Sequence, residues 1–149
     1  MRVHATLLVL PVLMTFFAAA PSLATDYTVQ MLNKGADGEL VFEPILTKIV
    51  KGDTITFVAV DKGHQVSTIE TMMPPGAPAF RGVESKPLKV TFHTEGAYVL
   101  KCVPHFEMGM VAVVIVGPTP PANLDVIKTG KLPKQARERV DAALAATGL

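Results

Sequence analysis

The sequence is most informative at Lys101-Cys102-Val103-Pro104-His105-Phe106-Glu107-Met108-Gly109-Met110. This stretch lies between the apolar runs 98–100 and 111–116, so we expect it to be a loop that joins two strands. It carries a thiol, an imidazole and two thioethers within nine residues. Cys102 is also the single cysteine of the 149-residue chain, which excludes an intramolecular disulfide. The loop therefore predicts a metal site.

The ligand types of this loop favour copper. Thiolate and thioether are soft ligands, and two histidines and a cysteine in a plane with a distant axial methionine form the ligand set of blue-copper electron-transfer sites. The loop supplies Cys102, His105 and a methionine, with the spacing leaving open whether Met108 or Met110 is the ligand. A structural zinc site would need more cysteine or histidine and would not use a thioether.

The second histidine must come from elsewhere, and His64 is the best candidate. It follows the apolar run 54–60 and stands beside Gly63, where one sheet can direct it toward the loop of another. His4 lies in the leader described below, and His93 stands at a strand end before a turn, where we assign it no role. Each residue is weak evidence alone, since a lone methionine more often fills a core. The copper prediction depends on their combination.

The N-terminus is typical of a secretory signal peptide. Arg2 precedes a nearly unbroken apolar run at 7–20, and small residues precede Thr25, so we predict a signal peptide at 1–24 and one mature domain at 25–149. A retained membrane anchor is less favoured, because the run has 14 residues and contains Pro11. The mature chain would carry 13 basic and 13 acidic residues, which gives no indication of nucleic-acid binding. We expect no membrane contact after cleavage.

The rest of the chain predicts an all-β sandwich or barrel with a helical tail. Short runs of strand character are separated by turn signals such as Asn33-Lys34-Gly35, while the proline-rich stretch 69–87 should wrap one edge. Helical patterns follow within about 122–147, at 122–128 and more clearly at 133–147, where Pro133 can open a helix with one apolar stripe. The expected strands are 27–31, 40–42, 45–50, 54–60, 88–92, 98–100 and 111–116.

Four segments together resemble the pseudoazurin family of bacterial periplasmic cupredoxins. They are the ligand loop, Asp61-Lys62-Gly63-His64, Met31-Leu32-Asn33-Lys34-Gly35 and the tail 134–141. The resemblance covers nearly all of the mature chain and implies a Greek-key β-sandwich of the cupredoxin type with two C-terminal α-helices. It also implies one copper ion bound by His64, Cys102, His105 and Met110, which leaves Met108 as a neighbour.

The chain departs from the family pattern beside the expected ligands. The family usually has Asn after the first histidine and often Thr after the cysteine, and these two side chains bond to each other; here the positions are Gln65 and Val103. Valine has no hydroxyl, so this bond is lost or replaced, and the groups around a ligand tune the metal. Glu107 stands where the family often has a small residue. Pro104 agrees with the family and has no N–H to donate to the thiolate.

The expected function is transfer of single electrons between redox proteins, with copper alternating between Cu(I) and Cu(II). Electrons would pass through the exposed edge of His105. The resemblance implies a monomer in the periplasm that docks transiently on partners such as copper nitrite reductase or c-type cytochromes. It also implies a basic ring for docking at Lys34, Lys62, Arg81 and Lys101.

Two other classes of copper protein share some of these features. A copper enzyme would need further histidines for a second copper centre, so the chain is not expected to be an enzyme. A periplasmic copper chaperone or storage protein is the alternative, and Met72-Met73 is the feature in its favour.

Overall fold

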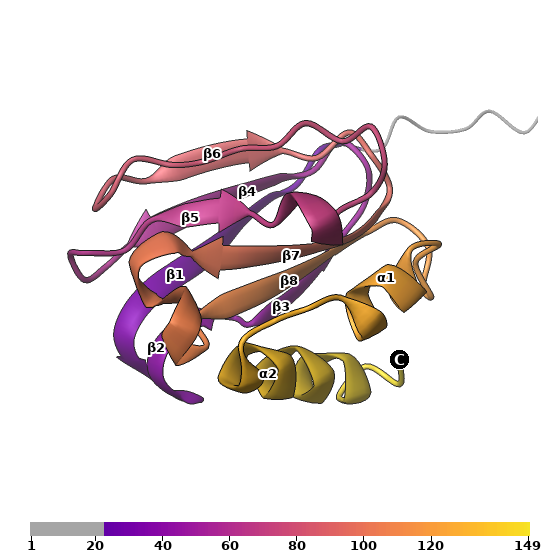
Figure 1. Ribbon diagram of the computed structural model, residues 1–149. Coiled ribbons are helices and arrows are strands. Elements are labelled where there is room, and N and C mark those ends of the chain that lie inside the picture. The colour runs from indigo at the N-terminus through magenta and orange to yellow at the C-terminus, as the bar shows by residue number, and fades with distance from the viewer. Residues whose placement is uncertain (1–22) are drawn as a thin grey trace, which may run out of the picture.

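A computed structural model describes residues 23–149. Nearly all of the expected signal peptide, residues 1–22, lies outside the described part. Within residues 23–149, eight strands form two four-stranded sheets that pack face to face, and two helices cover the outer side of one sheet (Figure 1). The expected Greek-key sandwich with two C-terminal helices is confirmed.

The first sheet has the strand order β2-β1-β4-β6. β1 runs parallel to β4, while its pairing with β2 and the pairing of β4 with β6 are antiparallel. β1 continues to Gly35, so the turn expected at 33–35 is wrong by about two residues, and the chain turns at Ala36 and Asp37 instead. The strands are β1 (Asp26–Gly35), β2 (Gly38–Glu43), β4 (Thr54–Ala59) and β6 (Leu88–Thr91).

The second sheet has the strand order β3-β8-β7-β5 and carries the loop that joins β7 to β8. β3 runs parallel to β8, and the other neighbours are antiparallel. The sequence did not indicate β5, because its three residues include a single large apolar side chain. The strands are β3 (Leu46–Ile49), β5 (Val66–Thr68), β7 (Gly96–Cys102) and β8 (Val111–Val116).

Two apolar cores lie on opposite faces of the second sheet. One fills the space between the sheets and includes Cys102 and Met110. The other lies between the sheet and the helices α1 (Leu124–Thr129) and α2 (Lys134–Ala145). All six residues of β8 are buried because both faces of this strand are covered, which explains its unbroken apolar sequence. The expected helices are confirmed.

The proline-rich segment 69–87 borders the edge of the second sheet, as expected. It begins with a short 3-10 helix, η1 (Glu70–Met72), and returns along β5. The N–H of Thr68 donates to the carbonyl of Phe80, and the N–H of Gly82 donates to the carbonyl of Val66. These bonds cover an edge that would otherwise be free to pair with another chain. None of the helices within residues 23–149 is long and apolar enough to cross a membrane.

Candidate metal centre

Pairing between β5 and β7 brings His64 to Cys102. Val66 of β5 lies opposite Cys102 of β7, and the N–H of Val103 donates to the carbonyl of Gln65 at 2.8 Å. His64 stands two residues before Val66, just ahead of the strand, so this register places its ring beside the end of β7. Both His64 and Cys102 are fully buried.

The ligand loop closes a tight path from β7 back to β8. It consists of 3-10 turns, η2 (Val103–Met108), followed by Gly109 at a φ of +84°. The N–H of Met110 donates to the carbonyl of His105 at 3.2 Å, and the N–H of Cys102 donates to the carbonyl of Met110 at 3.0 Å. The loop therefore holds Cys102, His105 and Met110 close together through its own backbone.

One nitrogen of His64, one nitrogen of His105 and the sulfur of Cys102 form a compact cluster of possible metal-ligand atoms. The Nδ1 atom of His64 lies 3.6 Å from the sulfur of Cys102, and the Nδ1 atom of His105 lies 3.5 Å from it. The ligand atoms of these residues all lie within 4.8 Å of one another. The centroids of the two imidazole rings lie 5.0 Å apart and the ring planes are inclined at 65°, so the rings meet edge to face and do not stack. One ion can contact all three side chains.

Burial shifts the pKa values of His64 and Cys102. It lowers the pKa of His64, and the nearby imidazole of His105 lowers it further, so His64 is held neutral with a nitrogen lone pair available. Burial also raises the pKa of the Cys102 thiol, while the N–H of Gln65, 3.5 Å from the sulfur, favours the thiolate. A metal that binds here must displace the thiol proton.

The two methionines of the loop have different surroundings. Met110, the last residue of the loop, is fully buried within the core between the sheets. Met108 is 46% exposed at the surface. Met110 thus lies in the core that also contains Cys102, whereas Met108 faces solvent.

His105 and His64 also differ in accessibility. His105 is half-buried, between the exposed Pro104 and the half-buried Phe106. His64 is enclosed, and its Nε2 atom has no hydrogen-bond partner within the described chain. His105 is therefore the ligand candidate that reaches the surface.

The side chain of Gln65 turns away from Val103. Its amide nitrogen donates to the carbonyl of Gly82 at 2.7 Å, and its amide oxygen accepts a bond from Arg81 at 3.3 Å. The bond that the family pattern places between these two positions is thus replaced by bonds to the segment beside β5. Gln65 joins the His64 segment to the proline-rich border.

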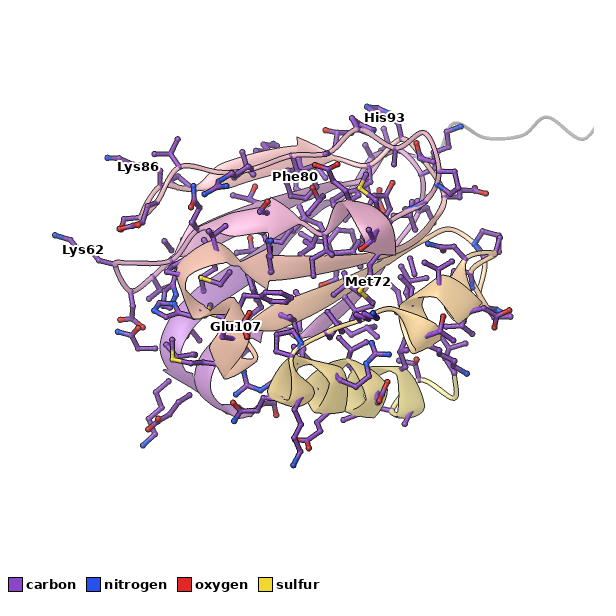
Figure 2. The ribbon with its side chains drawn as sticks, in the orientation of Figure 1. Lys62, Met72, Phe80, Lys86, His93 and Glu107 are labelled. Atoms are coloured by element: carbon purple, nitrogen blue, oxygen red, sulfur yellow. The ribbon has the colours of Figure 1, made fainter. Side chains whose placement is uncertain are left out.

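The four residues expected to form the docking ring differ in their exposure to solvent. Lys34, Lys62 and Arg81 are exposed, whereas Lys101 is half-buried with its ammonium 5.2 Å from the centre of the Phe106 ring. Figure 2 shows Lys62 and Glu107 at the end of the sandwich that carries η2.

Lys86 and His93 lie at opposite ends of the sandwich (Figure 2). Lys86, which the sequence did not single out, is exposed at the same end as Lys62. His93 lies at the opposite end, away from the cluster (Figure 2).

The donor set fits copper. A thiolate and two imidazole nitrogens that converge without a carboxylate favour copper over the harder cations, and a buried thioether lies next to them. Structural zinc would need a fourth cysteine, histidine or carboxylate, and no such side chain joins the cluster within residues 23–149.

Known proteins identify the family. Residues 29–117 match the family model described as copper binding proteins, plastocyanin/azurin family. A putative pseudoazurin of Rhizobium leguminosarum bv. viciae is 51% identical over 86% of this chain and 84% of its own. The pseudoazurin of Paracoccus pantotrophus is 47% identical over 85% of this chain and 87% of its own.

Solved structures of pseudoazurins have the same fold as this chain. The pseudoazurin of Methylobacterium extorquens AM1 superposes with a TM-score of 0.78 at 40% identity, covering 82% of this chain and 98% of that one. That of Hyphomicrobium denitrificans gives 0.76 at 40% identity, covering 81% and 97%. The chain therefore belongs to the plastocyanin/azurin family of copper-binding proteins, as a pseudoazurin whose metal is copper.

Proposed function

We propose that the chain is a periplasmic electron carrier and that His64, Cys102, His105 and Met110 would hold its copper ion. The observation that carries this assignment is the approach of both Nδ1 atoms to one buried sulfur, at 3.5 and 3.6 Å. Members of the family carry electrons and are not enzymes. Bound copper supplies a reversible change of one electron.

The chain's own residues hold one geometry and exclude water. His64 and Cys102 are buried, and the register of β5 on β7 fixes their separation. Met110 is held by backbone bonds to His105 and Cys102. A donor set that is held so firmly has little freedom to rearrange when the charge of the metal changes, which favours fast transfer.

Electrons would enter and leave at His105. Its ring reaches from the sulfur to the surface, and Pro104 and Met108 expose apolar surface beside it. An apolar patch of this kind can lie close against a partner without costly desolvation of charge. Transient docking needs only a small contact of this type.

The proposed partners are a copper nitrite reductase or a c-type cytochrome, met by the chain as a monomer. Lys34, Lys62, Arg81 and Lys101 would attract an acidic surface around the partner's redox centre. The test is the bimolecular rate of electron exchange with each purified partner. Exchange no faster than with an unrelated cytochrome would contradict the proposed partners.

The proposed location depends on the N-terminal segment. We propose that residues 1–24 are a cleaved signal peptide and that residues 25–149 form the mature domain. Mass spectrometry of the protein from a periplasmic extract would find an N-terminus near Thr25. An uncleaved chain would contradict this part of the proposal.

The alternative role as a copper chaperone or storage protein has little support in the surface. Met72 is fully buried in the core beside the helices, and Met73 is half-buried, so this pair does not present two thioethers to solvent. A visible spectrum separates the two roles. The proposed site gives an intense thiolate-to-Cu(II) band, whereas a carrier of Cu(I) cargo gives none.

A further inference from the structure

Helix α2 contacts the ligand loop through Arg139. The Nη1 atom of Arg139 donates to the carbonyl of Gly109 at 2.9 Å and to that of Leu40 at 2.8 Å, and Nη2 donates to the carbonyl of Glu39 at 2.8 Å. One guanidinium thus ties α2 to β2 and to the loop at the same time. Bonds from a charged donor are among the stronger hydrogen bonds in proteins.

The bonded carbonyl belongs to the peptide that leads into Met110. The carbonyl of Gly109 and the N–H of Met110 form one rigid peptide plane. That N–H donates to the carbonyl of His105, so the plane is held on one side by His105 and on the other by Arg139. The orientation of this plane determines where the chain of Met110 starts.

The same part of the loop is packed against the beginning of α2. A Cβ atom at Gly109 would lie 2.8 Å from the Cβ of Gln135 and 3.0 Å from its carbonyl carbon, closer than atoms can approach without a shift. Phe106 of η2 packs into the core between the second sheet and the helices. The loop therefore rests on α2 by close packing as well as through Arg139.

We propose that Arg139 is a positioning residue for the metal site. By holding the Gly109–Met110 peptide against α2 and β2, it sets the point from which the thioether of Met110 reaches the metal. This inference rests on the proposed role of Met110 as axial ligand. It gives the C-terminal helix a part in tuning the site, in addition to covering the sheet.

Arg137 provides a matched control on the same helix. It also makes three hydrogen bonds to backbone carbonyls, two to Ile127 at 2.9 Å and one to Lys128 at 2.7 Å. These bonds join α2 to α1 and do not involve the ligand loop. Arg137→Gln therefore removes similar bonds without touching the metal site.

The first measurement is amide hydrogen exchange in the reduced, copper-loaded protein. Arg139→Gln should raise exchange at Gly109 and Met110 about tenfold, because the loop loses its anchor. The amide of Val113, bonded to the carbonyl of Ile45 in the core, reports opening of the whole fold. Arg139→Lys should give a smaller rise, and Arg137→Gln should leave the loop amides unchanged relative to Val113.

The second measurement is the reduction potential with the visible spectrum. Both should shift in Arg139→Gln and remain as in the wild type in Arg137→Gln. Loop exchange that stays unchanged, or that rises equally in both glutamine variants, would overturn the inference. Faster exchange with an unchanged potential would reduce Arg139 to a loop anchor and overturn its positioning role.

Failure of the proposed function and misfolding of the variant can each be told apart from failure of this inference. If the wild-type protein itself lacks the thiolate-to-copper band, the proposed function fails, whatever the exchange data show. If Arg139→Gln does not fold, Arg139→Lys carries the same test, because lysine keeps the charge and can reach fewer of the three carbonyls.

Discussion

The two segments that enclose the metal site are held in different ways. The segment 60–65, which carries His64, is positioned by sheet pairing through the neighbouring β5 and by the side-chain bond from Gln65 to Gly82. The ligand loop 103–110 is held from outside the sheet, where Gly109 rests on α2 and accepts a bond from Arg139. The first support is mainly backbone pairing between strands, and the second is a side-chain bond and close packing from a helix.

Because of this difference, His64 and Cys102 are positioned by other contacts than Met110. Cys102 is fixed by the β5–β7 ladder and His64 by its place just ahead of β5; this pairing tolerates many side chains because the bonds are between backbone groups. The approach of Met110 depends on a particular arginine and on a glycine that cannot be replaced without displacing α2. Substitutions in the segment 60–65 and in the ligand loop should therefore have separate effects on the site.

The largest effect is expected at Cys102, where the two segments meet. Cys102→Ser should abolish the intense visible band, because the hydroxyl is not a soft ligand and no other thiol exists in the chain. The fold should persist, since it depends on no disulfide, with a loss of about 1–3 kcal/mol for a buried hydroxyl. Visible absorption and thermal unfolding measure the two effects.

His93→Ala is the control for this substitution, since His93 lies at the opposite end of the sandwich (Figure 2). It should keep the band at full intensity. A Cys102→Ser protein that retained the band would exclude the thiolate as a ligand and with it the assignment of both segments.

The next effect is confined to the ligand loop. Met110→Gln should keep copper bound, because the planar ligands remain, and should lower the reduction potential, because a hard oxygen favours Cu(II). A shift of about 60 mV would correspond to a tenfold change in relative affinity for the two oxidation states. Protein-film voltammetry measures it directly.

Met108→Gln is the matched change two residues away, at a side chain that is 46% exposed. Its potential should differ little from that of the wild type. A larger shift at Met108 than at Met110 would show that the axial ligand has been assigned to the wrong methionine.

The sequence predicted the parts of the fold that depend on local pattern. The strands at 54–60 and 111–116 were indicated by continuous apolar runs, and the tail helix by its apolar stripe. β5 escaped prediction because three residues carry no periodicity. The turn expected at 33–35 was placed too early, because Asn33 and Gly35 favour turns in general but here continue a paired strand.

The ligand types of the site could be predicted from the sequence, but the contacts that hold the ligand loop could not. The ligand types of the loop indicated copper, and His64 was placed by its position after a strand. Spacing alone did not distinguish Met108 from Met110, and the resemblance to a family was needed. The bond from Arg139 to Leu40 joins residues 99 positions apart, so no local pattern could indicate it.

A smaller effect is expected in the segment that carries His64. Gln65→Ala removes the bonds to Gly82 and Arg81 while leaving the backbone N–H of residue 65 beside the sulfur. A net loss of about 1 kcal/mol corresponds to roughly fivefold faster loss of copper to a chelator. The colour should remain, because the β5–β7 register is unchanged.

Arg81→Gln removes the weaker of these two bonds and serves as the comparison. Its copper loss should be closer to that of the wild type. If Gln65→Ala released copper no faster than Arg81→Gln, the bond to Gly82 would have no part in holding this segment.

The smallest effect concerns docking, which should leave both segments intact. Replacing Lys34 and Lys62 by alanine should slow electron exchange with an acidic partner a few-fold at low salt, because local charge steers the encounter. The difference should shrink as salt rises, since exposed charges are screened over about 8 Å at physiological ionic strength. Lys101 is left in place because it also lies over the Phe106 ring.

A second double variant separates local charge from net charge. Lys51 and Lys128 are both exposed and lie away from η2. Lys51 is in the turn between β3 and β4, where the N–H of Gly52 donates to the carbonyl of Phe92. Lys128 is on α1 (Figure 1). Replacing both by alanine changes the net charge by the same amount. If the two double variants slow exchange equally, net charge alone steers the encounter; if neither does, the apolar surface around His105 is sufficient for docking. Slowing only in the Lys34 and Lys62 variant, with an unchanged copper spectrum, would locate the docking surface at the end of the sandwich where both segments meet.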